Sequence, residues 1–256
     1  MRRQVFTIAR FTLLEAVRTR LPLLAVTVFG LLWACSFFIH QIAITESTRL
    51  QSSFFASGAR LAAVFMLALY ITSSVVREFN EKGLELLLAL DLPRSSYLLG
   101  KLAGFIVVAA ALALVAVLPL VPAVPLDVAA IWAISLTLEL AVICAASLFC
   151  IVTFSHILPA VLLVASFYLL ARTVTAMRLM AESSVLGELS GARPALNFGV
   201  EALSYVIPAL DQFSATQWIA ARAVAPEVLA PLVLQSAIYV ALLLAATLVD
   251  FYRREL

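Results

Sequence analysis

The sequence predicts an all-α integral membrane protein with six transmembrane helices in a single domain, residues 1–256. Hydrophobic residues make up 64% of the chain and charged residues 12%, whereas soluble proteins average about 45–50% and about 25%. Six apolar runs alternate with polar stretches, and about 20 apolar residues in a helix cross a hydrocarbon core of ~30 Å. The net charge of +2 argues against a nucleic-acid partner.

Residues 2–20 are predicted to form an amphipathic helix that lies in the headgroup layer of the membrane. Its apolar face carries Val5, Ile8, Ala9, Leu13, Ala16 and Val17, and its opposite face carries Arg3, Thr7, Arg10 and Arg18. A cleaved signal peptide is the competing interpretation. It is disfavoured because no short apolar core ends in a small-residue cleavage site.

The apolar runs place the six spans in order along the chain. A polar connection, residues 40–60, separates the first two spans, prolines at 119, 122 and 125 separate the third from the fourth, and a short turn at 155–159 precedes the fifth. The expected spans are about 21–39, 61–76, 98–118, 128–154, the run from that turn to about 174, and 228–249.

Residues 175–227 differ in composition from the spans around them, because they mix charged residues with glycine and proline. Two short helices are predicted there, near 198–207 and 213–224. Their aromatic residues suit the interface between membrane and water: Phe198, Tyr205, Phe213 and Trp218. The segment is expected to lie outside the cytoplasm, where an extracytoplasmic partner could meet it.

The distribution of lysine and arginine predicts the orientation, since cytoplasmic flanks carry an excess of both. An N-terminus inside the cell puts most of these residues on the inner side. The exceptions on the outer side are Arg49, Arg60, Arg172, Arg178, Arg193 and Arg222. Both termini are therefore predicted to be cytoplasmic, in the cell membrane, which for a prokaryote is the inner membrane.

Residues 77–101 combine dense charge with a helical apolar stripe between the second and third spans. The stripe recurs at the spacing of one helix face and comprises Phe79, Gly83, Leu86, Leu87 and Leu90. The other side carries Glu78, Glu81, Lys82 and Glu85. Asp91 and Pro93 then end the predicted helix, because proline removes a donor and restricts the residue before it.

This segment resembles the first cytoplasmic loop of ABC transporter type-2 permeases. The resemblance is carried by Arg77-Glu78, by the run from Glu81 to Leu88, by Pro93-Arg94-Ser95 and by the run from Tyr97 to Lys101. Leu84 follows Gly83 directly, where the family usually has threonine.

The resemblance implies an exporter's permease subunit of six spans, in which this loop is a coupling helix that docks on a separate ATPase subunit. The permease would pair with a second copy or a homologue, and it would contact membrane lipid. ATP and Mg would be bound by the ATPase, and no cofactor by this chain, which lacks a GxxxxGK[ST] phosphate loop. The residues implied in docking are Glu78, Phe79, Glu81, Gly83, Glu85, Leu86 and Leu87.

Glu139 lies near the middle of the fourth span. An ionisable group there costs at least ~2.5 kcal/mol on insertion scales, so it is expected to face protein or water. It could contact substrate or a gate, or it could be a protonated or paired carboxyl that holds two helices together. Gln235 and Ser236 in the last span are candidate partners, and they could equally form hydrogen bonds between helices.

No residue is predicted to be catalytic or to bind a metal. An HExxH motif and a GxGD motif are absent, and Cys35, Cys144 and Cys150 lie inside apolar runs. Two other functions stay open: a membrane scaffold or assembly factor without translocation, and an ion-coupled secondary carrier, which only Glu139 supports. A scaffold would form a stable complex without ATP-dependent flux, whereas a carrier would need no ATPase.

Overall fold

The chain folds as a bundle of long helices in the computed structural model, which describes residues 2–42, 46–80, 94–182, 207–214, 217–221 and 223–253. These residues contain no β-strand. Six helices of this described part are long and apolar enough to cross a membrane, as in a multi-pass membrane protein. The expected all-α class is confirmed, and the number of these helices agrees with the six expected spans.

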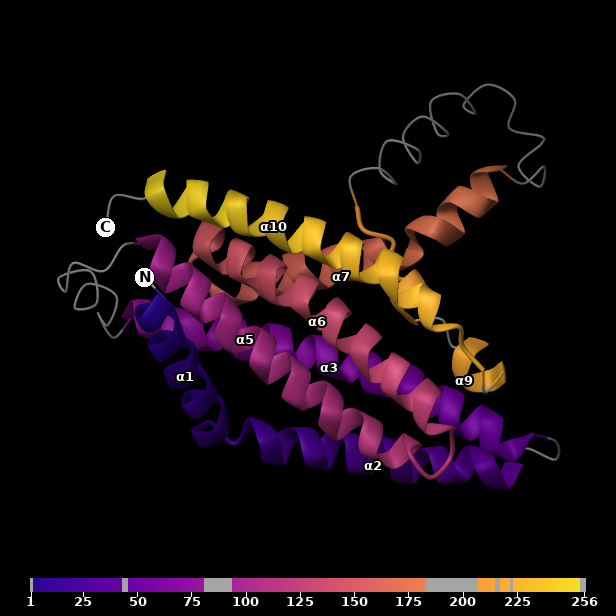
Figure 1. Ribbon diagram of the computed structural model, residues 1–256. Helices are drawn as coiled ribbons and strands as arrows, with labels where there is room; N and C mark the ends of the chain where they lie inside the picture. The colour runs from indigo at the N-terminus through magenta and orange to yellow at the C-terminus, as the bar shows by residue number, and fades with distance from the viewer. Residues whose placement is uncertain are drawn as a thin grey trace.

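The helices follow the order of the apolar runs. They are α1 (Arg2–Arg18), α2 (Leu21–Ile42), α3 (Ser47–Asn80), α5 (Arg94–Val117), α6 (Leu126–Phe154), α7 (Ile157–Glu182), α9 (Gln217–Ala221) and α10 (Leu229–Arg253). Short 3₁₀ turns cover Leu118–Leu120, Gln212–Ser214 and Pro226–Val228. Figure 1 shows that α1 begins and α10 ends at the same end of the bundle, called the α1 end below.

The helix α3 is much longer than the predicted second span, and the expected polar connection over 40–60 is wrong for most of its length. The helix already begins at Ser47. Its first turns pack on α2, where the Gln51 side chain donates a hydrogen bond to the Ser36 hydroxyl at 3.3 Å. Phe55 and Ala59 are fully buried. The polar residues of this stretch therefore serve helix packing.

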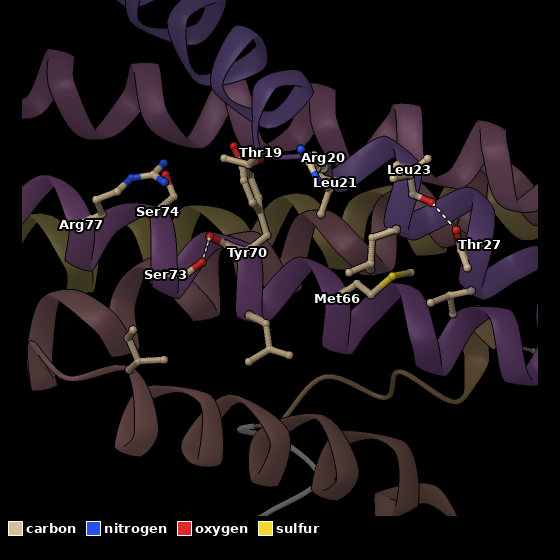
Figure 2. A pocket seen from close by; sticks show the side chains of 14 residues that line it. Thr19, Arg20, Leu21, Leu23, Thr27, Met66, Tyr70, Ser73, Ser74 and Arg77 are labelled. Carbon is tan, nitrogen blue, oxygen red and sulfur yellow. Dashed lines mark hydrogen bonds between the residues drawn. The ribbon is translucent and has the colours of Figure 1, made fainter.

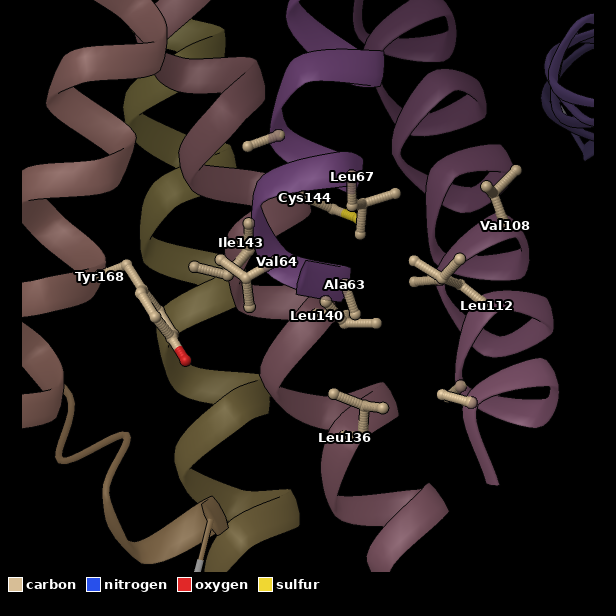
Figure 3. Packing of buried hydrophobic residues seen from close by; sticks show 14 of the residues in the cluster. Ala63, Val64, Leu67, Val108, Leu112, Leu136, Leu140, Ile143, Cys144 and Tyr168 are labelled. Atoms are coloured by element: carbon tan, nitrogen blue, oxygen red, sulfur yellow. The ribbon is translucent and has the colours of Figure 1, made fainter. Parts of the chain in front are cut away.

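The helix α6 lies at the centre of the bundle and contacts α3, α5, α7 and α10. It is buried on nearly all sides, which explains why its sequence shows no apolar stripe. Figure 3 shows its Leu136, Leu140 and Cys144 packed among side chains of α3 and α5, such as Leu67 and Leu112. Layers of this kind hold the long helices together.

The N-terminal helix α1 packs closely against α5. A Cβ atom added to Gly100 would lie 2.7 Å from Cβ of Ile8, and one added to Gly104 would lie 2.7 Å from Cβ of Thr12. The two glycines are four residues apart and share a face, so they let the backbones approach. Thr12 is buried while Val17 is 60% exposed, so the predicted apolar face differs from the buried one.

The stretch that was expected to follow the fifth span begins inside a helix, since α7 continues to Glu182. Of the two short helices predicted there, the first lies outside the described residues apart from Ile207. The second is represented by α9, Gln217–Ala221. Residues 81–93, which hold most of the predicted coupling helix, are also outside the described residues.

Candidate functional site

A buried cluster of charged side chains joins three of the long helices. Glu139 of α6 accepts a hydrogen bond from the Arg60 guanidinium of α3, with Oε2 and Nη1 2.5 Å apart. Its other oxygen, Oε1, lies 3.7 Å from Nη1 of Arg172 in α7. The side chains of Arg60 and Glu139 are 1% and 0% exposed. Two guanidinium groups thus face one carboxylate inside the bundle.

Three side chains on one face of α6 contact the Arg60 guanidinium. Trp132, Ser135 and Glu139 are spaced by three and four residues, which places them on the same side of the helix. Ser135 Oγ accepts a hydrogen bond from Nη2 of Arg60 at 2.7 Å. The Arg60 guanidinium carbon lies 5.2 Å from the centroid of the Trp132 ring, within reach of a cation–π interaction.

Arg172 is the accessible member of this ion cluster, because 28% of its side chain is exposed. Its guanidinium donates to the Tyr168 hydroxyl one helical turn earlier, at 2.9 Å. The described part of the following segment docks beside it. The backbone N–H of Leu210 donates to the carbonyl oxygen of Ala171 at 3.0 Å, and Thr175 donates to Asp211 at 2.9 Å.

The position of Glu139 agrees with the expectation that it faces protein, but its partners differ from the candidates. Arg60 and Arg172, two of the arginines assigned to the outer side, neutralise it. The Ser236 hydroxyl instead donates to the carbonyl oxygen of Val233 in its own helix, at 3.0 Å. Gln235 is half-buried in the same helix, and the described ion pairs of Glu139 are with Arg60 and Arg172.

Arg60 and Arg172 were missed because no local spacing connects them to Glu139. Arg60 lies 79 positions away in the sequence. One signal was available: a carboxylate in the middle of a span needs a cation, and these arginines lie at the edges of apolar runs. Both were instead assigned to outer flanks in the prediction of orientation.

A second polar network lies at the α1 end, where α3 ends and α5 begins. Glu15 of α1 forms an ion pair with Arg77 of α3 and accepts a hydrogen bond from the Ser74 hydroxyl at 2.8 Å. The Lys101 ammonium group of α5 lies 3.5 Å from the Glu15 carboxylate and pairs with Glu78. These side chains of Glu15, Ser74, Arg77, Glu78 and Lys101, called the root network below, tie the end of α3 and the start of α5 to α1.

Two residues predicted to meet an ATPase contact this chain's own helices. Glu78 accepts a hydrogen bond from the Tyr97 hydroxyl at 2.5 Å, besides its pair with Lys101. Phe79 is half-buried and packs against the cluster of Tyr97, Leu98 and Phe251. The other predicted docking residues lie outside the described part of the chain: Glu81, Gly83, Glu85, Leu86 and Leu87.

The root network lowers the pKa of the Glu15 carboxyl. Partial burial by itself would raise the pKa of this carboxyl, but Lys101, Ser74 and Arg77 outweigh the burial and hold the pKa below its ordinary value of 4.5. Hydrogen bonds and cations both favour the charged form. Glu15 is therefore held ionised where α1 meets α3 and α5.

A cavity of about 720 Å³ lies beside α3, between the turn that joins α1 to α2 and the start of α7. Its walls are mostly apolar and include Leu24, Met66 and Leu69. Figure 2 shows Ser74 and Arg77 at one end of it and Thr27 at the other. The cavity thus joins an apolar wall to a polar end, formed by Ser74 and Arg77, next to the root network.

The described residues contain no group of three or more His, Cys, Asp or Glu side chains that could hold a metal ion. Cys144 and Cys150 are buried in the helix bundle, while Cys35 is exposed. No protein-family model matches the chain, and no curated protein matches it. Its function is therefore argued from the residues and their arrangement.

Proposed function

We propose that this chain is the membrane-spanning permease subunit of an ATP-driven exporter of the ABC type-2 class. It would couple ATP hydrolysis by a separate ATPase subunit to the movement of a substrate. The resemblance of residues 77–101 to the family's coupling loop motivates the proposal. The observation that carries it is the root network, in which Glu78, Arg77 and Lys101 anchor both helices that flank this loop.

The network gives the loop a mechanical connection to the interior of the bundle. A displacement of residues 81–93 would act on the end of α3 and the start of α5. The helix α3 is continuous from Ser47 to Asn80, so it links this end to Arg60 and the buried ion cluster. Seventeen residues separate Arg60 from Arg77, which at 1.5 Å per residue is about 25 Å of helix.

In this proposal the cavity beside α3 receives the cargo. An apolar wall with a polar end suits an amphipathic molecule. The cavity is bounded by Arg77 and Ser74, which also belong to the root network. Movement of the loop would then change the shape of the cavity directly.

The test is co-purification with an ATPase. A tagged chain would be purified from its own cells in mild detergent, the bound proteins identified by mass spectrometry, and the ATPase activity measured. Leu86→Asp is expected to leave the permease inserted but to lose the ATPase, because docking of a helix in a groove depends on a few buried anchors. Glu85→Ala should weaken the complex less and make it more sensitive to salt.

A Leu86→Asp chain that retains an ATPase with a normal response to substrate would contradict the proposal. A complex that hydrolyses ATP without any flux in proteoliposomes would favour the scaffold. Flux driven by an ion gradient in the absence of an ATPase would favour the secondary carrier.

A further inference from the structure

A groove of about 620 Å³ lies between α1 and α5, and it shares no lining residue with the cavity beside α3. Its walls include Ala9 and Leu13 of α1 and Leu99, Ala103 and Val107 of α5. It runs along α5 from Ser96 to Val107, eleven residues or about 16 Å of helix. That is close to half of a hydrocarbon core of ~30 Å, so the groove is about one leaflet deep.

Two polar side chains line this otherwise apolar groove: Ser96 and Arg10. Ser96 is 1% exposed, and its hydroxyl has no hydrogen-bond partner among the described residues. A buried polar group without a partner is unfavourable, so this hydroxyl requires an explanation. A ligand atom that accepts its hydrogen bond would provide one.

Arg10 is exposed, and no acidic side chain of the described residues forms an ion pair with it. Glu15 is the one acidic residue of α1, and it is engaged by Arg77 and Lys101. Among the described residues, the rim of the groove therefore offers a positive charge without an ion-pair partner. Phe6 and Phe11 project from the same helix with 73% and 66% exposure, a pattern typical of a helix that lies among lipid headgroups.

We propose that this groove binds an anionic glycerophospholipid from the membrane leaflet at the α1 end of the bundle. Phosphate oxygens would accept hydrogen bonds from the Arg10 guanidinium and the Ser96 hydroxyl, and an acyl chain would lie along Leu99, Ala103 and Val107. The lipid would hold α1 on α5 from outside, next to the contact at Gly100 and Gly104. This site is separate from the cargo cavity and does not depend on the proposed transport.

The experiment uses the full chain in a neutral detergent, mixed with equal amounts of phosphatidylglycerol and phosphatidylcholine, with bound lipids counted by native mass spectrometry. The wild type is expected to retain phosphatidylglycerol preferentially. Arg10→Gln should lower that preference about fivefold, since one arginine near a membrane surface contributes about 1 kcal/mol. Ser96→Ala, which removes only the hydroxyl, should also lower it, and Ala103→Leu should reduce the binding of both lipids by filling the groove.

Arg3→Gln is the matched control, because Arg3 is exposed on the same helix but does not line the groove. Equal losses in Arg3→Gln and Arg10→Gln would mean diffuse attraction of anionic lipid and would overturn the proposal. Undiminished binding in both Ser96→Ala and Ala103→Leu would overturn it as well. Glycerol phosphate that competes as strongly as the lipid would also overturn the proposal. A change in the oligomeric state of Ala103→Leu with unchanged lipid binding would overturn it too.

Discussion

Glu139 shows how a single ionisable residue can organise a membrane bundle. Its carboxylate meets Arg60 at 2.5 Å and Arg172 at 3.7 Å, so charges from three helices compensate one another. Buried ion pairs often add little net stability, but removing one partner leaves an uncompensated charge and costs about 3–5 kcal/mol. Two roles were considered for Glu139: a contact with substrate or a gate, and a paired carboxyl that holds helices together. The ion pairs with α3 and α7 are those that the second role requires.

We therefore expect Glu139→Gln and Arg60→Gln each to lower the melting temperature and the yield of the detergent-solubilised chain. The loss in the double variant should be smaller than the sum of the two single losses, because the Arg60–Glu139 pair is removed as a unit and only the partly exposed Arg172 loses its carboxylate. Thermal unfolding of all three variants measures this. Additive losses would show that the two side chains do not interact, and normal stability with altered transport would favour a contact with substrate.

Glu15 makes a second prediction at this scale, concerning pH. Its folded pKa is below the ordinary value of 4.5, so its contribution to stability is present above pH 4.5 and is lost as the pH falls through the folded pKa. Glu15→Gln should lower the melting temperature at pH 7, by a difference that narrows below pH 4.5. Glu46→Gln is the control, because its pair with Arg49 is exposed and should have little effect. A difference that stays constant down to pH 3 would contradict the assignment.

At the scale of elements, the packing of α1 on α5 depends on having no side chain at two positions. A Cβ at Gly104 would come within 2.7 Å of Thr12 and 3.1 Å of the Ala9 carbonyl oxygen. Because the second of these atoms is backbone, the helices would have to separate.

Gly104→Ala is accordingly expected to destabilise this contact by about 1–3 kcal/mol, the usual range for overpacking. A disulfide cross-link between cysteines introduced in α1 and α5 should form more slowly in this variant. Gly30→Ala in α2 is the control, since nothing lies within 4 Å of the added atom, and it should be neutral or slightly stabilising. Equal effects at the two positions would refute the close contact.

At the scale of the whole molecule, six helices among the described residues are long enough to cross a membrane. We predict that all six do so, which would put the start of α1 and the end of α10, close together in Figure 1, on one side of it. The charge distribution predicts that this side is the cytoplasm. A reporter fused after Leu256 should be active only in the cytoplasm, and a tag at Gly191 should react with an impermeant reagent from outside. Labelling of the tag at Gly191 only after the cells are opened would place Gly191 in the cytoplasm and contradict this predicted topology.

Much of the fold could be predicted from sequence because apolar runs report the lipid environment directly. The predicted bounds of the third and fourth spans lie within a few residues of the bounds of α5 and α6. The start of α3 was missed because Gln51 and Ser52 are polar yet buried, and hydropathy does not distinguish a polar residue that packs from one that is solvated. The ion cluster was missed because its members come from α3, α6 and α7, and only the packed bundle brings them together.

The turn between α6 and α7 has a consequence for how the chain enters the bilayer during synthesis. Ser155 takes a left-handed conformation, with φ 59°, and its N–H caps the helix by donating to the Ile151 carbonyl oxygen. Only Ser155 and His156 separate the two helices, so they reach the translocation machinery as one hairpin. Glu139 and Arg172 then enter together, with opposite charges already close, and the cost of about 2.5–3.5 kcal/mol for a lone charge at the centre of a helix is reduced. Arg60 is made earlier, so its full neutralisation awaits the arrival of this hairpin.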